Sequence, residues 1–349
     1  MSVTSSTFGY LPTNEKVLQF TLRNKYGLTA KIINYGATLT ELWTPDKNGQ
    51  FTNIVLGYTN IENYLKHSPY FGATIGRFAN RIAKGQFTLN GITYQLATNS
   101  EPNHLHGGPT GIAKQLWQAA PFKSLENSIE FFCFSPDGEE GYPGDMTIRV
   151  KFELTNNDEL KINYRATTSS NSIINLTNHA YFNLKGKDKI LDHQLWLNSD
   201  YITPTDAANI PTGKLMMVTK TPFDFRTLTP IGQRINADHP QLEYGNGYDH
   251  NWVIKGWGNS LQTAAKLYES TTGRSLEVAT TEPGIQVYTA NTLSDIPTDN
   301  PTIFFPDHGA VCLETQHYPD SPNHSNFPTT VLKAGEVFES ETVYKMFNE

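Results

Sequence analysis

The sequence predicts an all-β protein, a sandwich or barrel of short antiparallel strands with few short helices. Runs in which apolar and polar residues alternate recur along all 349 residues. Turn residues (Gly, Pro, Asn and Asp) separate these runs, and no long amphipathic helix interrupts them. Tyr and Phe, which favour strands, number 17 and 19. Because strand patterns run throughout without a linker or a repeat, we expect one domain over residues 1–349.

In the first third of the chain, alternating runs at residues 18–22 and 28–32 predict two strands, and residues 44–49 predict a turn. Residues 60–66 predict a short helix. The clearest local signal is the Asn90-Gly91 pair between alternating runs at residues 87–89 and 92–96. Such a pair predicts a two-residue hairpin with a type I′ turn.

Further alternating runs at residues 129–133, 148–154 and 160–164 predict three strands, the last two forming a hairpin with one buried and one exposed face. Thr229 and Pro230 have the residue types of an N-cap and a first helical turn, which predicts a short helix over residues 229–235. Later strands are predicted at residues 195–197, 252–254, 265–268, 276–280, 285–288 and 337–347.

Charge and composition restrict the partners. The net charge is −7, and the absence of a Lys/Arg run argues against nucleic acid and anionic membranes. No stretch approaches the roughly 18 apolar residues of a membrane span. The first residues lack the basic start and apolar core of a signal peptide. Cys133 and Cys312, in apolar alternating runs, are expected to be buried free thiols. We therefore expect a cytoplasmic protein.

The run at residues 311–316 carries the most informative single residue. Glu314 lies in the middle of an apolar strand pattern, and a polar, proline-rich loop follows it. A carboxylate in such a place needs partners or has a shifted pKa, because burying a charge is costly. Glu314 is therefore either a general base at the mouth of a pocket or one half of a structural ion pair with a Lys or Arg.

The sequence contains no P-loop, no dinucleotide-binding glycine fingerprint, no G-x-S-x-G and no H-E-x-x-H. His104 and His106 would share one face of a strand, but a third metal ligand is not evident nearby. Glu314 and His317 have the spacing of helical di-iron sites, yet their segment has the period of a strand. We expect neither a metal nor a nucleotide cofactor.

Several other polar residues interrupt apolar strands or lie in their loops, and each alone has a structural explanation. In a purely structural interpretation, Arg81 would pair with a surface carboxylate, His179 would tie down a strand end, and Asp249 would form a turn. Together, an arginine, two histidines and two carboxylates suit binding of, and proton transfer on, a neutral polyhydroxylated molecule. The set is Asn80, Arg81, His106, His179, Asp249 and Glu314.

Six segments resemble those of the galactose mutarotases, also called aldose 1-epimerases, in that family's order and spacing, and they cover nearly the whole chain. They are GRFANRIAKGQFTLNG (76–91), NHLHGG (103–108), NLTNHAYFNL (175–184), GYDHNWVI (247–254), EPGIQVYT (282–289) and CLETQHYPDSPNH (312–324). The resemblance implies a large antiparallel β-sandwich, the galactose mutarotase-like supersandwich, with an open cleft.

The resemblance also implies roles for individual residues. Glu314 corresponds to the catalytic base, His179 to the catalytic acid, and His106 to a second histidine near the ring oxygen and the C1 hydroxyl. Tyr181 corresponds to an aromatic residue beside the acid. The remaining positions match ligands of sugar hydroxyls, namely Asn80, Arg81, Asp249 and Gln286.

The implied activity is interconversion of the α and β anomers of free hexoses, D-galactose and D-glucose above all, by ring opening and reclosure. The expected partner is thus a monosaccharide, and the sequence leaves the oligomeric state open. A hexose-6-phosphate 1-epimerase would require a basic cluster for the phosphate, and none is seen near the motifs. A catalytically silent sugar-binding protein would lack the Glu314 and His179 pair. A glycosidase would use two carboxylates, with Asp249 and Glu314 as candidates.

Overall fold

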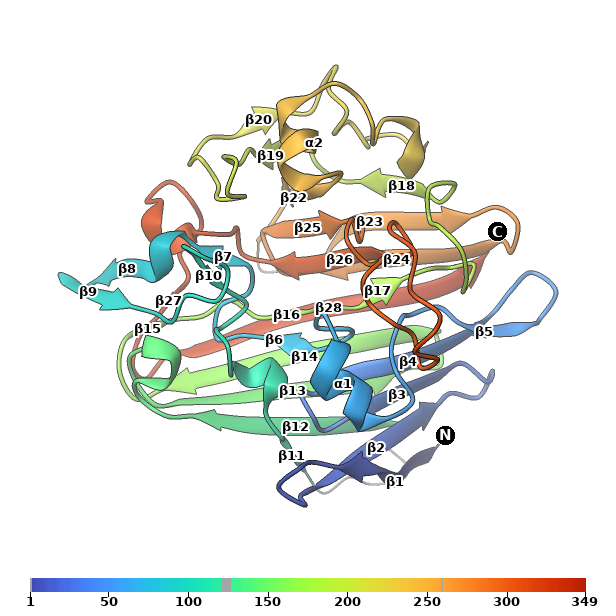
Figure 1. Ribbon diagram of the computed structural model, residues 1–349, viewed down its shortest axis with the longest axis horizontal. Coiled ribbons are helices and arrows are strands. Elements are labelled where there is room, and N and C mark those ends of the chain that lie inside the picture. The colour runs from blue at the N-terminus through green and yellow to red at the C-terminus, as the bar shows by residue number, and fades with distance from the viewer. Residues whose placement is uncertain (1, 121–126, 259) are drawn as a thin grey trace.

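The computed structural model describes residues 2–120, 127–258 and 260–349 (Figure 1). Its architecture is all-β, as the alternating pattern predicts: three antiparallel sheets of five, nine and six strands dominate it. The two ends of the chain lie on the same side of the molecule in this view (Figure 1).

The five-stranded sheet is a meander of consecutive strands, so each strand pairs with its neighbour in sequence. The strands predicted at residues 18–22 and 28–32 are its second and third members, and the predicted turn joins the last two. The sheet consists of β1 (Ser2–Tyr10), β2 (Lys16–Arg23), β3 (Thr29–Ile33), β4 (Thr38–Pro45) and β5 (Phe51–Asn53).

The nine-stranded sheet brings the C-terminal strand into its centre, between β14 and β24. The predicted hairpin at residues 148–164 is confirmed as β13 and β14, which alternate between buried and more exposed residues. In spatial order the sheet consists of β11 (Gln118–Ala119), β12 (Ser128–Ser135), β13 (Met146–Leu154), β14 (Glu159–Thr168), β28 (Val337–Asn348), β24 (Arg274–Thr280), β23 (Gln262–Glu269), β18 (Gln194–Leu197) and β21 (Thr229–Pro230).

The six-stranded sheet has two different faces. Val311 and Leu313 belong to the main hydrophobic core, whereas the alternate residue Glu314 faces away from it, because successive side chains of a strand point to opposite faces. In spatial order the sheet consists of β17 (Tyr181–Phe182), β26 (Val311–Gln316), β25 (Gly284–Tyr288), β22 (Asp249–Val253), β19 (Tyr201–Thr203) and β20 (Met216–Met217).

Four two-stranded ladders complete the strands: β8 (Gln86–Leu89) with β9 (Ile92–Gln95), β7 (Arg81–Ile82) with β10 (His104–Leu105), β6 (Thr74–Ile75) with β16 (Thr177–Asn178), and β15 (Ser172–Ile173) with β27 (Val331–Leu332). The β8–β9 hairpin confirms the predicted type I′ turn. Both central residues have positive φ, 53° for Asn90 and 78° for Gly91.

Helices are short and few in the described ranges. The predicted helix at residues 60–66 is confirmed as α1 (Ile61–His67), and the Asn60 side chain caps it by accepting a hydrogen bond from the Asn63 N–H. A second helix, α2 (Pro240–Gly245), was not predicted. Five single 3₁₀ turns are η1 (Ala83–Gly85), η2 (Ile112–Lys114), η3 (Glu139–Gly141), η4 (Ile231–Gln233) and η5 (Ser321–Asn323).

The prediction of a helix over residues 229–235 is wrong. Thr229 and Pro230 form the edge strand β21 against β18, and only Ile231–Gln233 turn as a 3₁₀ helix, without a side-chain cap. Gly232 packs so closely on Leu191 that a Cβ at this position would lie 2.8 Å from the Leu191 Cβ. Pairing with the sheet therefore prevails over the capping pattern.

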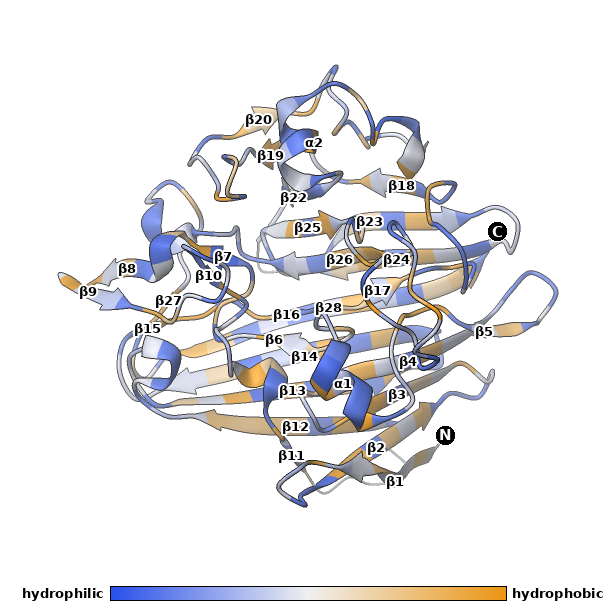
Figure 2. Cartoon of the chain, in the orientation of Figure 1, coloured by the Kyte–Doolittle hydropathy of each residue, from blue (hydrophilic) through white to orange (hydrophobic). Residues whose placement is uncertain are grey.

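The main core lies between the sheets, and the colouring in Figure 2 shows apolar residues repeating along their strands.

Cys133 and Cys312 are free and buried, as predicted. Among the described helices, none has the length and apolar character that crossing a bilayer requires.

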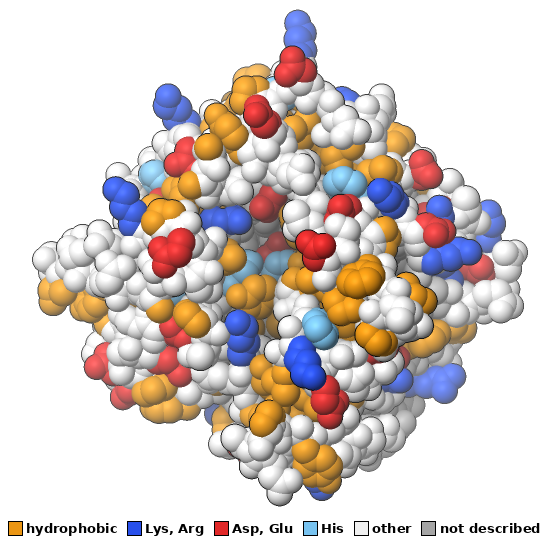
Figure 3. Space-filling model, in the orientation of Figure 1, with side chains coloured by type: hydrophobic (Ala, Val, Ile, Leu, Met, Phe, Trp, Pro, Cys, Tyr) orange, Lys and Arg blue, Asp and Glu red, His pale blue; other side chains and the backbone are white. Residues whose placement is uncertain are grey.

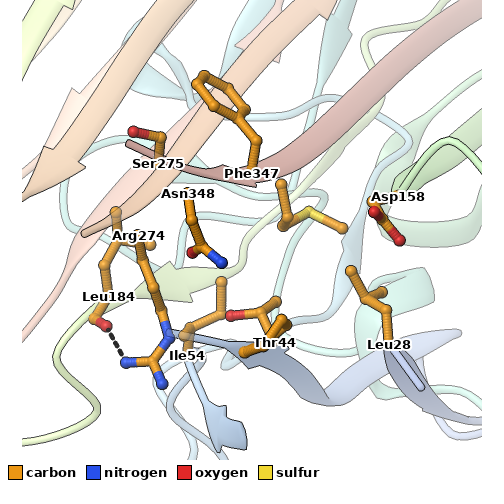
Figure 4. Close-up of a pocket in the computed structure, with 11 residues that line it drawn as sticks. Leu28, Thr44, Ile54, Asp158, Leu184, Arg274, Ser275, Phe347 and Asn348 are labelled. Atoms are coloured by element: carbon orange, nitrogen blue, oxygen red, sulfur yellow. Dashed lines mark hydrogen bonds between the residues drawn. The ribbon is translucent and has the colours of Figure 1, made fainter. Parts of the chain in front are cut away.

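A small cavity of about 220 Å³ lies where β24, the end of β28 and the N-terminal sheet meet (Figure 4). The buried guanidinium of Arg274 reaches across this junction. It donates hydrogen bonds to the backbone oxygen of Leu184 at 2.9 Å and to that of Gln50 at 2.8 Å. Arg274 thus ties separate parts of the chain together.

Candidate active site

The candidate site is a pocket of about 370 Å³ on the open face of the six-stranded sheet. Figure 3 shows a hollow in the middle of the visible surface in which acidic and histidine side chains gather beside a basic one. All the residues that the sequence singled out line it except Gln286, which contacts it through Asp249: Asn80, Arg81, His106, His179, Tyr181, Asp249 and Glu314.

Three neighbouring strands form the floor. Glu314 on β26 pairs in register with Gln286 on β25, and Gln286 pairs with Asn251 on β22. Asp249 lies two residues before Asn251, hence on the same face of the sheet. The Gln286 side chain uses this proximity and donates a hydrogen bond from Nε2 to Asp249 Oδ1 at 2.7 Å. Strand register alone therefore brings the two carboxylates into one pocket.

His179 enters from the segment between β16 and β17. Its backbone N–H donates to the Ala73 carbonyl, and its own carbonyl accepts from the Gly72 N–H, both at 2.9 Å. Its ring is nearly parallel to two tyrosine rings, with centroids 5.0 Å from Tyr181 and 6.1 Å from Tyr70 and interplanar angles of 18° and 24°. Stacking with two aromatic rings therefore holds the imidazole in place.

Tyr181 is buried, and its hydroxyl donates to the Pro69 carbonyl at 3.0 Å. Since the hydroxyl is already engaged and the ring stacks on His179, the geometry favours a role for Tyr181 in orienting the histidine. Tyr70, which the sequence reasoning missed, also packs edge-on against His106 at 4.9 Å. No motif marked Tyr70, because it lies in a loop between α1 and β6.

Asn80 and His106 hold each other on the opposite wall. The Asn80 N–H donates to His106 Nδ1 at 3.1 Å, and the His106 N–H donates to the Asn80 carbonyl at 3.0 Å. Since Nδ1 accepts a hydrogen bond, the proton of a neutral His106 ring lies on Nε2. Burial, followed by the neighbouring His179 and Arg81, lowers the pKa of His106 well below its usual value, so the ring is neutral.

The expectation that His104 and His106 share a face is wrong. Both ring nitrogens of His104 are engaged in hydrogen bonds within the fold, Nδ1 at 2.6 Å from the Ala97 oxygen and Nε2 at 2.6 Å from the Tyr142 hydroxyl. The strand β10 ends at Leu105, and His106 has a φ of 53°, which turns it toward the pocket instead. His317 likewise lies outside this pocket.

The electrostatic centre of the pocket is the pair formed by His179 and Glu314. His179 Nε2 lies 3.6 Å from Glu314 Oε2, and the two side chains are 6% and 2% exposed. Burial lowers the pKa of His179 to about 4. Burial, with the negative charge of Asp249 adding to it, raises the pKa of Glu314 well above its usual value. Burial therefore shifts both members of the pair toward their uncharged forms.

Arg81 supplies the positive charge of the pocket. Its guanidinium lies 3.8 Å from the Asp249 carboxylate, and it opposes the rise in the pKa of Glu314. Four buried polar atoms around the pocket have no hydrogen-bond partner within the described part of the chain: His179 Nδ1, Asn209 Oδ1, Gln286 Oε1 and Glu314 Oε2. Such groups are costly to leave unpaired, so the site suits a polar ligand.

His106, His179 and Glu314 could also face a metal ion, because one potential ligand atom from each lies within 4.8 Å of the others. Bonds of about 2 Å to a tetrahedral zinc ion would place ligand atoms roughly 3.3 Å apart. The three groups would have to approach one another to hold such an ion.

Fold and pocket together define a class of acid–base enzyme that acts on a neutral, polyhydroxylated molecule. Residues 18–345 match the family model described as Aldose 1-epimerase. Galactose mutarotases of Bos taurus and Homo sapiens are each 42% identical over 347 residues, covering 99% of this chain and 98% of theirs. The aldose 1-epimerase of Escherichia coli K12 is 34% identical over 97% of both chains.

Solved structures of other proteins have a similar fold. The galactose 1-epimerase of Lactobacillus acidophilus has a TM-score of 0.88 at 29% identity, covering 100% of this chain and 99% of its own. An aldose epimerase homologue from C. elegans has a TM-score of 0.85 at 30% identity, covering 94% and 98%. The chain belongs to the aldose 1-epimerase family. Its activity is that of a mutarotase, an isomerase acting on carbohydrates.

Proposed function

We propose that this protein interconverts the α and β anomers of free hexoses, D-galactose and D-glucose above all, with Glu314 as the base and His179 as the acid. The relatives named galactose mutarotase and aldose 1-epimerase support the substrate class. The observation that carries the assignment of roles is the 3.6 Å approach of His179 Nε2 to Glu314 Oε2 in a polar pocket.

In the proposed reaction Glu314 takes the proton of the anomeric O1 hydroxyl while His179 gives a proton to the ring oxygen. The C1–O5 bond breaks, and the open-chain aldehyde forms. Rotation about C1–C2 by about half a turn presents the other face of the carbonyl, and the reverse transfers close the ring as the other anomer. One positioned acid and one positioned base each contribute about 10²–10⁴-fold.

The number of protons on the His179 and Glu314 pair is consistent with these reaction steps. A neutral imidazole with a protonated carboxyl contains the same single proton as an imidazolium with a carboxylate. The buried pair favours the first form, because charges are poorly solvated there. Hydrogen bonds from a bound sugar and the charge of Arg81 favour the second, so the reactive form arises without a proton from solvent.

The other pocket residues bind and orient the sugar in this proposal. His106 donates from Nε2 to the ring oxygen or the C1 hydroxyl, since its Nδ1 is committed to Asn80. Arg81, Asp249 and Gln286 form a linked group that bonds vicinal hydroxyls. Asn80 supports Arg81 and His106, and Tyr181 orients His179.

A free hexose fits the pocket better than a hexose 6-phosphate. Arg81 is the single Lys or Arg among the described lining residues, and it already faces the Asp249 carboxylate. A phosphate dianion would require further cationic donors. Asp249 is likewise engaged with Gln286, which favours hydroxyl binding over a glycosidase role.

We also place the protein in the cytoplasm, as one domain over residues 1–349 that binds a monosaccharide and neither nucleic acid nor membrane. Its two buried free thiols support a reducing compartment. Its net charge of −7 supports the absence of polyanionic partners.

Polarimetry on freshly dissolved α-D-galactose and α-D-glucose tests the proposal, with wild type, Glu314→Gln and His179→Asn. We expect rapid relaxation with wild type and its loss in both folded variants. Matched controls are Glu62→Gln and His67→Asn on α1, outside the pocket lining, which should relax the sugars as wild type does. If wild type leaves the spontaneous rate unchanged for both sugars, the proposal fails, and hexose 6-phosphates are the next substrates to assay.

A further inference from the structure

A second and larger crevice lies where β24 passes to β25 and β26 ends. Its volume is about 880 Å³ against about 370 Å³ for the candidate active site, and the two share no lining residue among those described. We call it the end crevice and define it by five of its lining residues: Tyr164, Trp257, Glu282, His317 and Ser340. The proposed catalysis uses none of them.

Glu282 and His317 form a buried carboxylate–imidazole dyad on one side of the end crevice. Glu282 is 3% exposed, and its Oε2 lies 2.6 Å from His317 Nδ1. The backbone of His317 is fixed in turn by Asn175, which accepts from its N–H at 2.9 Å and donates to its carbonyl at 3.1 Å. Because Nδ1 faces the carboxylate, Nε2 is the nitrogen left to contact a ligand.

Two buried hydroxyls line the same crevice without a partner in the described residues, those of Tyr164 and Ser340. They belong to residues that are directly opposite each other on β14 and β28 and that are 2% and 6% exposed. Leaving a buried hydroxyl unpaired costs about 1–3 kcal/mol. Two such groups beside a polar dyad therefore indicate a place where ligand hydroxyls complete the hydrogen bonding.

Trp257 supplies an aromatic surface at this site. Trp257 is 45% exposed, which is unusual for a residue with so large a ring. Its indole Nε1 nevertheless donates a hydrogen bond to the Thr281 carbonyl at 2.9 Å. That hydrogen bond fixes the indole, which lies 6.4 Å from the His317 ring at an interplanar angle of 83°. A fixed, exposed ring can stack on the C–H face of a ligand.

The charges select the chemical class of ligand. The rim carries four ion pairs, Arg149 with Glu130 and Lys151 with Glu153 at 3.3 Å each, Arg165 with Glu339 at 3.4 Å, and Lys333 with Glu336 at 3.5 Å. The carboxylates of Glu282 and Glu341 disfavour an anion. Pairing of the other lining carboxylates, and of Glu282 with His317, leaves no cluster of free acidic groups for a cation, and the unpaired hydroxyls disfavour an apolar ligand. A neutral molecule with hydroxyls on its edges and C–H groups on its faces satisfies all three conditions.

We propose that the end crevice binds a neutral saccharide of two or more units, stacked on Trp257 and hydrogen-bonded by the dyad and the two hydroxyls. The size follows from the comparison of volumes, because the smaller pocket is the one proposed for a single hexose. This binding site is separate from the mutarotase site and does not depend on catalysis there.

Saturation-transfer NMR with trehalose, maltose and maltotriose tests the proposal on the full-length protein. Trp257→Ala removes the stacking surface and should weaken binding at least about tenfold. Tyr164→Phe removes one unpaired hydroxyl and should weaken it about threefold to tenfold without loss of thermal stability, since no internal hydrogen bond is lost. Tyr10→Ala, an exposed aromatic on β1, is the matched control and should bind as wild type does.

Arg81→Ala separates this site from the active site, because it disables the sugar pocket and leaves the end crevice intact. The proposal requires that transfer to the saccharides persists in this variant. It is overturned if transfer disappears in Arg81→Ala, if Trp257→Ala and Tyr164→Phe bind as wild type, or if wild type shows no transfer to any of the three. Saturation transfer to the cation tetramethylammonium, without transfer to the saccharides, would also overturn the proposal of a neutral saccharide ligand.

Discussion

The imidazole Nε2 of His179 lies 3.6 Å from the carboxylate Oε2 of Glu314, and both side chains are almost completely buried. Glu314 lies on β26 and His179 in the segment between β16 and β17, and the pocket opens onto both. At this distance and degree of burial the charge on one group affects the protonation of the other. In the proposed mechanism, the active form of the pair contains one proton.

The pH dependence of mutarotation follows from this pair. Burial holds the pKa of His179 at about 4, so the pair gains a second proton only as the pH falls toward 4. The pKa of Glu314 is raised, so its proton is lost only well above the usual carboxyl range. We expect the acidic limb of kcat/KM, corrected for the spontaneous rate, to lie near pH 4 and not in the ordinary histidine range. An acidic limb centred near 6.5, the ordinary histidine value, would contradict this account.

Tyr181 should act through the His179 ring. Tyr181→Ala removes a ring that stacks at 5.0 Å and leaves the imidazole free to tilt, so we expect kcat to fall about tenfold or more. Tyr181→Phe keeps the ring and loses only the hydrogen bond to Pro69, so its kcat should remain within about threefold of wild type. Steady-state kinetics of both variants check this, and equal losses in the two would show that the hydroxyl, not stacking, matters.

Asn175 should position both walls of the pocket. Its side chain bonds the backbone of His317, just after β26, and donates to the Ala79 carbonyl, just before Asn80. Asn175→Ala leaves these buried backbone groups unpaired, at about 1–3 kcal/mol each. We expect a lower Tm and a raised KM for galactose, whereas Asn48→Ala in an exposed turn should change neither. A variant with a lowered Tm and an unchanged KM would assign Asn175 to the fold alone.

Acid should destabilise the fold through two buried histidines outside the pocket. Burial lowers the pKa of His250 to about 3 and that of His193 to about 4, against about 6.5 in an unfolded chain. The unfolded state therefore binds more protons below pH 6.5. The free energy of unfolding should fall by about 1.4 kcal/mol per pH unit for each group as the pH decreases from 6.5 toward 4.

Urea unfolding at pH 7, 6 and 5 measures that slope. His250→Gln keeps a polar side chain but cannot titrate, so its stability should fall less steeply with pH than that of wild type, whatever its stability at pH 7. Equal slopes for the two proteins would mean that His250 does not contribute.

Much of the strand content could be predicted from the sequence, because side-chain alternation reflects a sheet with one buried face. This pattern located β13, β14 and β26, and placed Glu314 on the face opposite Leu313. It failed where pairing partners decide the outcome. The edge strand β21 resembles a capped helix, and α2 carries no long apolar period.

The site was predicted through its residue types and through family resemblance, since spacing cannot show that residues 249 and 314 line one pocket. Register supplies that information in the fold: Glu314 lies opposite Gln286, whose side chain reaches Asp249. Tyr70 escaped prediction because a loop residue that stacks on a distant histidine has no sequence pattern. The dyad of Glu282 and His317 escaped for the same reason, as 35 positions separate its members.

A double-mutant cycle on Glu314 and His179 tests the central claim most directly. The measured quantity is the enzyme-dependent rate of α-D-galactose mutarotation for wild type, Glu314→Gln, His179→Asn and the double variant. Because the two residues act as one unit, we expect each single variant to lose most of the activity and the double variant to lose little more. Losses that multiply, or a single variant that retains the wild-type rate, would contradict the acid–base pair.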